Sequence, residues 1–137
     1  MTKNIQDLIS EELKSANSLS DTSIHRIEED ILQRYKIDVI EGPDQGKSFY
    51  LINKKTIVGR GSVGIPLRDI DVSRLHAAFE VQENGQVLIR DLGSTNGTFV
   101  NDVRVADITL KSSDKIHMGT TKMIFNIEKV SEHVGER

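Results

Sequence analysis

The sequence predicts an all-β fold, a sandwich or barrel of short strands, for most of its 137 residues. From Lys36 onward, short apolar runs alternate with turn signals at Gly42-Pro43-Asp44, Glu83-Asn84-Gly85 and Asn96-Gly97. Many short strands separated by such turns are typical of sandwiches and barrels. No helical periodicity of roughly 10–15 residues interrupts the runs, which disfavours strands and helices alternating around a parallel sheet.

The expected strands are runs rich in apolar residues and bounded by turn signals. They cover residues 36–40, 48–52, 55–58, 65–67, 77–82, 87–91, 98–100, 115–118 and 122–128. In the last run, Met123, Phe125 and Ile127 occupy alternate positions, which predicts that one face of this strand is buried.

Residues 1–34 differ from the rest because they contain no glycine or proline and many polar residues. Apolar residues recur at helical spacing from Ile5 to Leu13 and from Ile24 to Tyr35, on either side of a polar linker at residues 15–23. We therefore expect a partly helical extension (1–34), a β domain (35–130) and a short tail (131–137). Helices this short are marginal alone, so they either pack on the domain or self-associate through residues 5–35.

Composition excludes several classes of protein. The chain is 36% hydrophobic and 28% charged, has a net charge of −3, and contains neither cysteine nor tryptophan. The absence of cysteine excludes disulfides, thiol catalysis and cysteine-based zinc sites, and we expect neither a metal nor a cofactor. The chain has neither a large excess of positive charge nor enough aromatic residues to stack on bases, so we do not expect nucleic-acid binding. It also has no apolar run long enough to predict a membrane span. Met1–Ser10 lack a signal-peptide pattern, so a cytoplasmic location is expected.

Gly59-Arg60-Gly61-Ser62-Val63-Gly64 matches the glycine pattern of dinucleotide-binding loops. Such a site needs a helix that begins in the loop, because the helix N-terminus binds the pyrophosphate. Here Ile65-Pro66-Leu67 follows, and its composition predicts extended chain. We therefore expect a loop in which glycine lets the backbone approach a ligand closely.

Three polar segments stand where expected strands end or begin: Gly59-Arg60, Ser73-Arg74-Leu75-His76, and the segment from Asp91 to Asn101. Arg60 could bind two phosphate oxygens, or form an ordinary surface ion pair. A serine hydroxyl can donate to phosphate, and an asparagine amide can bracket a peptide backbone. Asn-Gly, however, is first a signal for a two-residue hairpin turn.

His76 has two interpretations. It could act as a general base for Ser73 in a hydrolase, or it could hold a loop in place as a buried structural residue. The structural role is favoured, because Asp71 and Asp91 are the only nearby acids in sequence and neither is clearly placed to orient the imidazole. We therefore expect a binding protein rather than an enzyme.

Together, the three segments follow the order and strand pattern of the forkhead-associated (FHA) family, which the chain resembles from about Tyr35 to Val130. The resemblance implies an FHA-type β-sandwich of antiparallel and mixed strands that binds phosphothreonine peptides, as short bacterial FHA proteins do. The implied ligand contacts are Arg60 and Ser73 to phosphate, Asn96 to the peptide backbone, and Thr95 and Arg74 as helpers. Gly59, His76 and Gly97 would shape the site without touching the ligand.

The resemblance also implies a signalling adaptor that acts downstream of a Ser/Thr protein kinase and binds a phosphothreonine-containing protein. An alternative is phosphate-independent docking by the same fold, within a secretion or transcription-regulating complex. The segment around Thr22 is loosely similar to the phosphorylated tail of short actinobacterial FHA regulators of 2-oxoglutarate metabolism. Phosphorylated Thr22 would then bind the domain's own site, where tethering raises the effective concentration.

Overall fold

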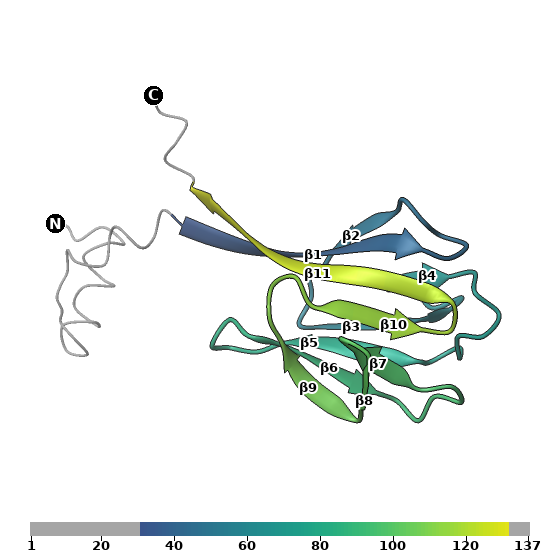
Figure 1. Cartoon of the computed structure of the whole chain (residues 1–137). Coiled ribbons are helices and arrows are strands. Elements are labelled where there is room, and N and C mark those ends of the chain that lie inside the picture. The colour runs from purple at the N-terminus through teal and green to yellow at the C-terminus, as the bar shows by residue number, and fades with distance from the viewer. Residues whose placement is uncertain (1–30, 132–137) are drawn as a thin grey trace, which may run out of the picture. The chain divides into compact units, whose positions relative to one another are not determined.

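A computed structural model describes residues 31–131, which form eleven strands in two sheets (Figure 1). The all-β prediction is confirmed. The first 30 residues, with the helical stripe from Ile5 to Leu13 and with Thr22, lie outside the described residues, as do residues 132–137. Residues 33–128 form one compact unit.

The first sheet has six strands in the order β2-β1-β11-β10-β7-β8. These are β1 (Ile31–Glu41), β2 (Ser48–Tyr50), β7 (Thr98–Val100), β8 (Val103–Val105), β10 (Lys115–Met118) and β11 (Thr121–Ser131).

The second sheet has five strands in the order β4-β3-β5-β6-β9. These are β3 (Lys55–Arg60), β4 (Ile65–Leu67), β5 (Ala77–Val81), β6 (Val87–Asp91) and β9 (Asp107–Leu110). Strands β3 and β4 pair in parallel and the others in this sheet pair antiparallel, so the predicted mixture of strand directions is confirmed.

The helical prediction for the stripe from Ile24 to Tyr35 is wrong at its end, because β1 already begins at Ile31. The Tyr35 ring stacks on Phe125 with centroids 6.4 Å apart, and its hydroxyl donates to the Gly85 carbonyl at 2.8 Å. Ile37 and Val39 are buried at alternate positions further along the strand. Pairing within the sheet thus overrides a periodicity that also fits a helix.

Strands β8 and β9 were not expected from the sequence. Both lie at sheet edges and are mostly exposed, so they lack the apolar alternation that reveals a half-buried strand. The β7–β8 hairpin turns at Asn101 and Asp102, which both have positive φ (50° and 71°). Asn96-Gly97, by contrast, connects β6 to β7 in different sheets, so its interpretation as a hairpin turn is wrong.

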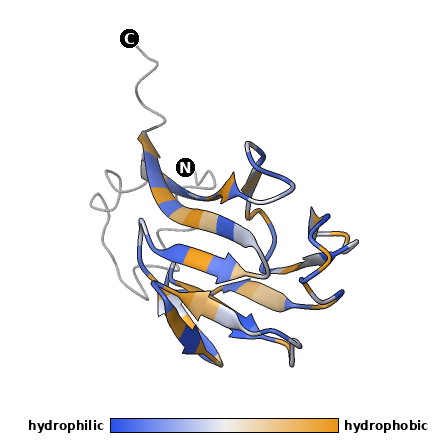
Figure 2. Ribbon diagram, turned by 45° about the vertical axis from the view of Figure 1, so that its right-hand side comes forward, coloured by the Kyte–Doolittle hydropathy of each residue, from blue (hydrophilic) through white to orange (hydrophobic). Residues whose placement is uncertain are grey.

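The core lies between the two sheets, and apolar and polar residues alternate along several strands (Figure 2). Phe79 of β5 and Phe125 of β11 are its largest fully buried side chains. Met123 and Phe125 are both fully buried, as the alternation in this strand predicted. Burying a side chain of this size stabilises a fold by about 1.5–3 kcal/mol.

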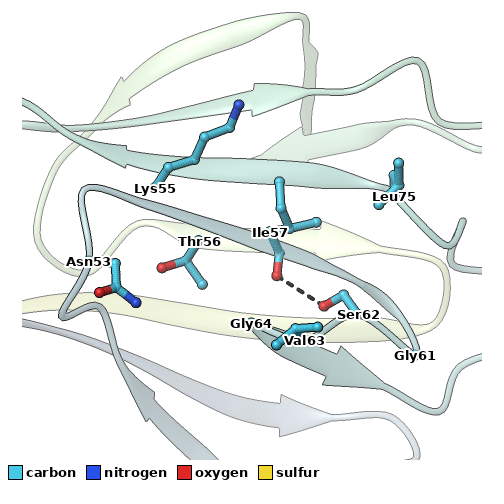
Figure 3. A pocket seen from close by; sticks show the side chains of 9 residues that line it. All are labelled: Asn53, Lys55, Thr56, Ile57, Gly61, Ser62, Val63, Gly64 and Leu75. Atoms are coloured by element: carbon cyan, nitrogen blue, oxygen red, sulfur yellow. Dashed lines mark hydrogen bonds between the residues drawn. The ribbon is translucent and has the colours of Figure 1, made fainter.

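The glycine-rich segment is a tight loop between the parallel strands β3 and β4 (Figure 3), and no helix follows it. A Cβ atom on Gly64 would lie 2.5 Å from the Ile57 carbonyl oxygen, and Ser62 Oγ donates to that same oxygen at 3.0 Å. Gly64 therefore makes room for the chain's own backbone. The dinucleotide interpretation is excluded. The expectation that glycine lets the backbone approach a ligand does not explain Gly64, because the atoms close to it belong to the chain itself.

Candidate functional site

A small polar pocket of about 170 Å³ lies where three connecting segments meet. It is lined by Arg60, Ile70, Asp71, Val72, Ser73, Thr95 and Asn96. Arg60 ends β3, residues 70–73 belong to the connection from β4 to β5, and Thr95 and Asn96 belong to the connection from β6 to β7. The structure therefore brings together four of the five expected ligand residues, while Arg74 is exposed and does not line the pocket.

Backbone contacts hold Arg60 beside Ser73. The Arg60 amide donates to the Ser73 carbonyl at 3.0 Å. One residue earlier, a Cβ on Gly59 would lie 2.0 Å from the Arg74 carbonyl oxygen, so only glycine permits this approach of β3 to the segment. The sequence places a glycine before Arg60 because the two backbones pass so closely.

Side chains link the third segment to the second. The Thr95 amide donates to Ser73 Oγ at 3.1 Å, and Asn96 Nδ2 donates to the Asp71 carbonyl at 2.9 Å. Thr95 and Asn96 are exposed, so these two bonds orient residues that have little packing of their own. The serine and the asparagine are thus parts of one hydrogen-bonded arrangement.

His76 is fully buried beneath the pocket, and both of its ring nitrogens are engaged by backbone groups. Its Nδ1 accepts from the Ser73 amide at 3.0 Å, and its Nε2 lies 2.9 Å from the Gly97 carbonyl oxygen. An amide can only donate and a carbonyl can only accept, so the ring proton resides on Nε2. Neither nitrogen is free to take a proton from the Ser73 hydroxyl, which contradicts the hydrolase interpretation.

Asp91 organises the connection that carries Thr95 and Asn96. Its carboxylate accepts from the Gly93 amide at 2.9 Å, from the Ser94 amide and hydroxyl at 3.0 and 2.6 Å, and from the Thr98 hydroxyl at 2.7 Å. Asp91 was not among the expected site residues. An Asp with Gly and Ser two and three residues later is a recognisable signal for a turn held by the Asp side chain.

Several hydrogen-bonding groups of the pocket have no partner among residues 31–131. Within residues 31–131, the Arg60 guanidinium forms neither an ion pair nor a hydrogen bond. The Ser73 hydroxyl accepts from Thr95, so its own proton can be donated to a ligand. In the described part of the chain, Asn96 has one Nδ2 proton left to donate and its Oδ1 left to accept a hydrogen bond from a ligand. One cation and several donors around a small hollow suit an anion with several oxygen atoms.

A second hollow of about 250 Å³ adjoins the first and is lined by Asp71, Asn96, Phe99 and Gly119. Asp71 and Asn96 line both hollows, so the two lie next to each other. An exposed cation lies nearby, because a Cβ on Gly97 would be 2.9 Å from Arg104 Nε. Arg104 belongs to β8, a strand the sequence did not reveal, so no sequence signal pointed to it.

Acid should destabilise the domain through Asp44, Asp69 and Asp91. Burial, the largest influence, raises the pKa of each carboxyl, but hydrogen bonds outweigh it and leave each pKa below its ordinary value. The stability they contribute is therefore complete above the unfolded pKa of about 3.9 and is lost as the pH falls through the lower folded pKa. Urea unfolding from about pH 6 to about pH 3 measures this loss. Asp91→Asn should flatten the slope below about pH 4, and an unchanged slope would contradict the assignment.

The fold and the pocket define a small β-sandwich module with a loop-built pocket whose polar groups suit an anionic ligand. Residues 56–119 match the FHA domain family, and the chain belongs to that family. It is 38% identical over 88 residues to the glycogen accumulation regulator GarA of Mycolicibacterium smegmatis and to the oxoglutarate dehydrogenase inhibitor of Corynebacterium efficiens. Each match covers 64% of this chain, and 55% and 61% of the two relatives, so it spans only part of their length.

Solved FHA domains share the fold. A domain from a study of phosphothreonine-dependent FHA interactions is 31% identical, with a TM-score of 0.62 over 68% of this chain and 95% of that one. The FHA domain of CT664 from Chlamydia trachomatis is 33% identical, with a TM-score of 0.62 over 68% and 96% of the two chains. Among residues 31–131 there is no helix of the length and apolarity needed to cross a bilayer.

Proposed function

We propose that this chain is a cytoplasmic, non-enzymatic signalling adaptor that binds phosphothreonine in a partner protein downstream of a Ser/Thr kinase. The observation that carries the proposal is the convergence of Arg60, Ser73 and Asn96 on one pocket. Within residues 31–131, the Arg60 guanidinium, the Ser73 hydroxyl proton and part of the Asn96 side-chain amide have no hydrogen-bond partner. Similarity to a solved domain described by phosphothreonine-dependent interactions supports it.

The proposed contacts follow from the chemistry of each group. A phosphothreonine carries a charge of about −1.5 to −2 and three strong acceptor oxygens. Arg60 can donate to two of these oxygens at once, and the free Ser73 proton can be donated to a phosphate oxygen. Asn96 can donate to and accept from the peptide backbone on one side of the phosphate. Arg74, exposed beside Ser73, adds attraction during approach.

Apolar side chains in the pocket favour threonine over serine. Ile70 and Val72 line the pocket, and Ile70 is 82% exposed. A threonine methyl packed against them would gain contact that serine cannot make. One methyl group in an apolar site typically changes affinity by roughly 10- to 200-fold, and the low end applies to a site this open.

Titration of wild-type protein with a phosphothreonine peptide, its phosphoserine analogue and its unphosphorylated twin tests the proposal. The expected dissociation constant for phosphothreonine is on the order of micromolar, because ordering of the peptide offsets much of the contact energy. Phosphoserine should bind more weakly by about tenfold, and the unphosphorylated twin should not bind. Equal binding of all three peptides would refute phosphate recognition.

The relatives support a regulatory role for the proposed adaptor. Their names describe a regulator of glycogen accumulation and an inhibitor of oxoglutarate dehydrogenase. We infer that this chain also acts by binding and restraining a protein partner.

Self-binding of phosphorylated Thr22 is a finer proposal for a residue outside the described range. Thr22 stands in a polar linker, and the nearest described residue of the chain is Ile31. A short tether can raise the effective concentration of its own ligand to about millimolar, above a micromolar dissociation constant. Protein phosphorylated at Thr22 should therefore bind an external phosphopeptide much more weakly, and Thr22→Ala treated with the same kinase should bind it normally. Equal affinity of the two proteins would exclude self-binding.

A further inference from the structure

We propose that Asp69 is a positioning residue that holds Asn96 in its peptide-binding orientation, acting through the backbone of Asp71. The inference rests on the proposed peptide-binding function of Asn96. It adds a residue that does not line the pocket and that no sequence motif indicated.

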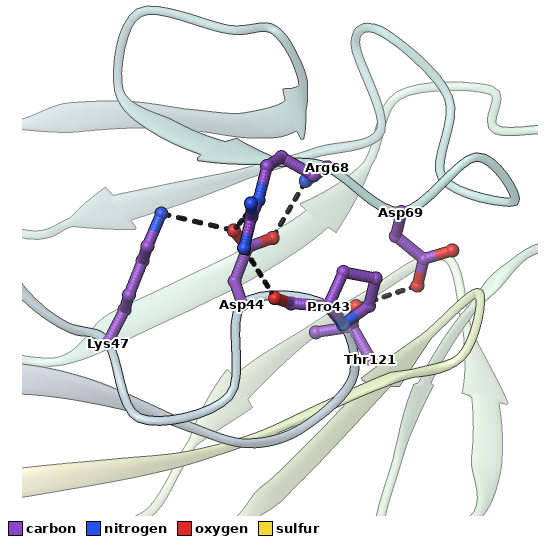
Figure 4. Close-up of polar contacts among 6 residues, drawn as sticks. All are labelled: Pro43, Asp44, Lys47, Arg68, Asp69 and Thr121. Atoms are coloured by element: carbon purple, nitrogen blue, oxygen red, sulfur yellow. Dashed lines mark hydrogen bonds and ion pairs between the residues drawn. The ribbon is translucent and has the colours of Figure 1, made fainter.

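Asp69 connects the segment before Ser73 to the turn between β10 and β11. It is 2% exposed. Its Oδ2 accepts from the Thr120 amide at 2.7 Å, the Thr120 hydroxyl at 2.9 Å and the Thr121 hydroxyl at 2.7 Å (Figure 4 shows the contact with Thr121). The carboxylate thus joins a connection of the second sheet to a turn of the first sheet.

The turn is packed too closely against Asp69 to shift freely. A Cβ on Gly119 would lie 2.9 Å from Asp69 Oδ2 and 2.8 Å from Val72 Cγ2, and Gly119 has a positive φ of 61°. The buried Thr121 side chain supports the same contact from the start of β11. Asp69 is therefore held from one side by the closely packed turn between β10 and β11 in the first sheet.

The other carboxylate oxygen of Asp69 is linked to the pocket through Asp71. Asp69 Oδ1 accepts from the Asp71 amide at 3.0 Å, and the Asp71 carbonyl accepts from Asn96 Nδ2 at 2.9 Å. Within the described residues, this is the only hydrogen bond of the Asn96 side chain, which is otherwise exposed. Without it the amide would sample several rotamers, and binding would have to order it first.

Asp44 provides a matched comparison (Figure 4). It is 1% exposed and accepts from the Arg68 amide at 2.7 Å, from Arg68 Nε at 2.9 Å and from Lys47 Nζ at 3.1 Å. Asp44 thus holds the residue that immediately precedes Asp69 but contacts neither Asp71 nor Asn96 within residues 31–131. Loss of either carboxylate removes a buried acceptor. Of the two, only Asp69 is linked by hydrogen bonds through Asp71 to Asn96 in the described part of the chain.

A double-mutant cycle tests the link, with phosphothreonine-peptide affinity as the readout. Asp69→Asn places an amide group among the three donors from Thr120 and Thr121, and it should weaken binding roughly 3- to 30-fold. In an Asn96→Ala background the same change should have no further effect, since the group it positions is gone. Asp44→Asn should lower the melting temperature but keep affinity within about twofold, because the hydrogen bonds of Asp44 go to Arg68 and Lys47 and not to Asp71 or Asn96.

The inference would be overturned if the double variant lost affinity by the product of the two single fold-losses of Asp69→Asn and Asn96→Ala. It would also be overturned if Asp44→Asn lost as much affinity as Asp69→Asn. Thr121→Val is a milder variant should Asp69→Asn fail to fold, and it should show the same dependence on Asn96. The NMR signals of the Asn96 side-chain amide provide a readout without ligand and should broaden or shift in Thr121→Val. If wild-type protein binds no phosphopeptide, the proposed function fails, while this NMR result still decides whether Asp69 orients Asn96.

Discussion

Replacing Arg60 by alanine is expected to abolish phosphopeptide binding while the fold stays intact. The guanidinium is exposed and makes no polar contact within residues 31–131, so the unfolding free energy should change by no more than about 0.5 kcal/mol. Affinity should fall by at least roughly 100-fold, because two charge-assisted bonds to the phosphate are lost together. Calorimetric titration and urea unfolding of the same samples measure both effects.

Two further variants separate the role of Arg60 from that of positive charge in general. Arg60→Lys keeps the charge but cannot bind two oxygens in the same plane, so it should restore only part of the affinity. Arg74→Ala removes an exposed cation outside the pocket, and it should weaken binding only a few-fold, with an effect that fades at high salt. If Arg60→Ala retains its partner, the domain docks by a phosphate-independent surface instead.

Replacing Gly59 by alanine is expected to impair both the fold and the site. The added Cβ would lie 2.0 Å from the carbonyl oxygen of Arg74 and 2.9 Å from that of Ser73. Both are backbone atoms, so neither can move away by a change of rotamer. We expect a loss of stability of about 2–4 kcal/mol, at or above the usual range for overpacking. Because Arg60 bonds to Ser73 one residue further on, peptide affinity should fall as well.

Gly46→Ala is the control for this substitution. Gly46 has a positive φ of 97°, but an added Cβ would meet no atom within 4 Å. Its cost is therefore backbone strain alone, about 1 kcal/mol, and it should leave affinity unchanged. Urea unfolding and peptide titration of both variants provide the comparison. Equal losses of stability would show that the close approach at Gly59 relaxes easily.

Sequence patterns predicted most of the strands, because a strand with a buried face shows apolar residues at alternate positions. The alternation of Met123, Phe125 and Ile127 identified β11, since a strand with one buried face repeats every two residues. The edge strands β8 and β9 have no such face, and Val103 of β8 is 62% exposed. The stripe that ends at Ile31 and Tyr35 satisfied a helical period by spacing alone, but β1 begins at Ile31.

Short polar motifs in the sequence predicted the residues that line the pocket but not the residues that hold them in place. Arg60, Ser73 and Asn96 were recognisable because each stands in a short polar motif, and they meet in one pocket. Asp69 was not recognisable, because its partners Thr120 and Thr121 lie about fifty residues away in sequence.

The positions of most strands along the chain, and the side-chain types available to bind an anion, are thus local properties that alternation and turn residues indicate. The distances between those side chains are not local properties. They depend on the contact of Gly59 with Arg74, on the two nitrogens of His76, and on the carboxylates of Asp69 and Asp91. Most of these contacts join segments far apart in the chain, and they exist only because the packing of two sheets brings the loops together.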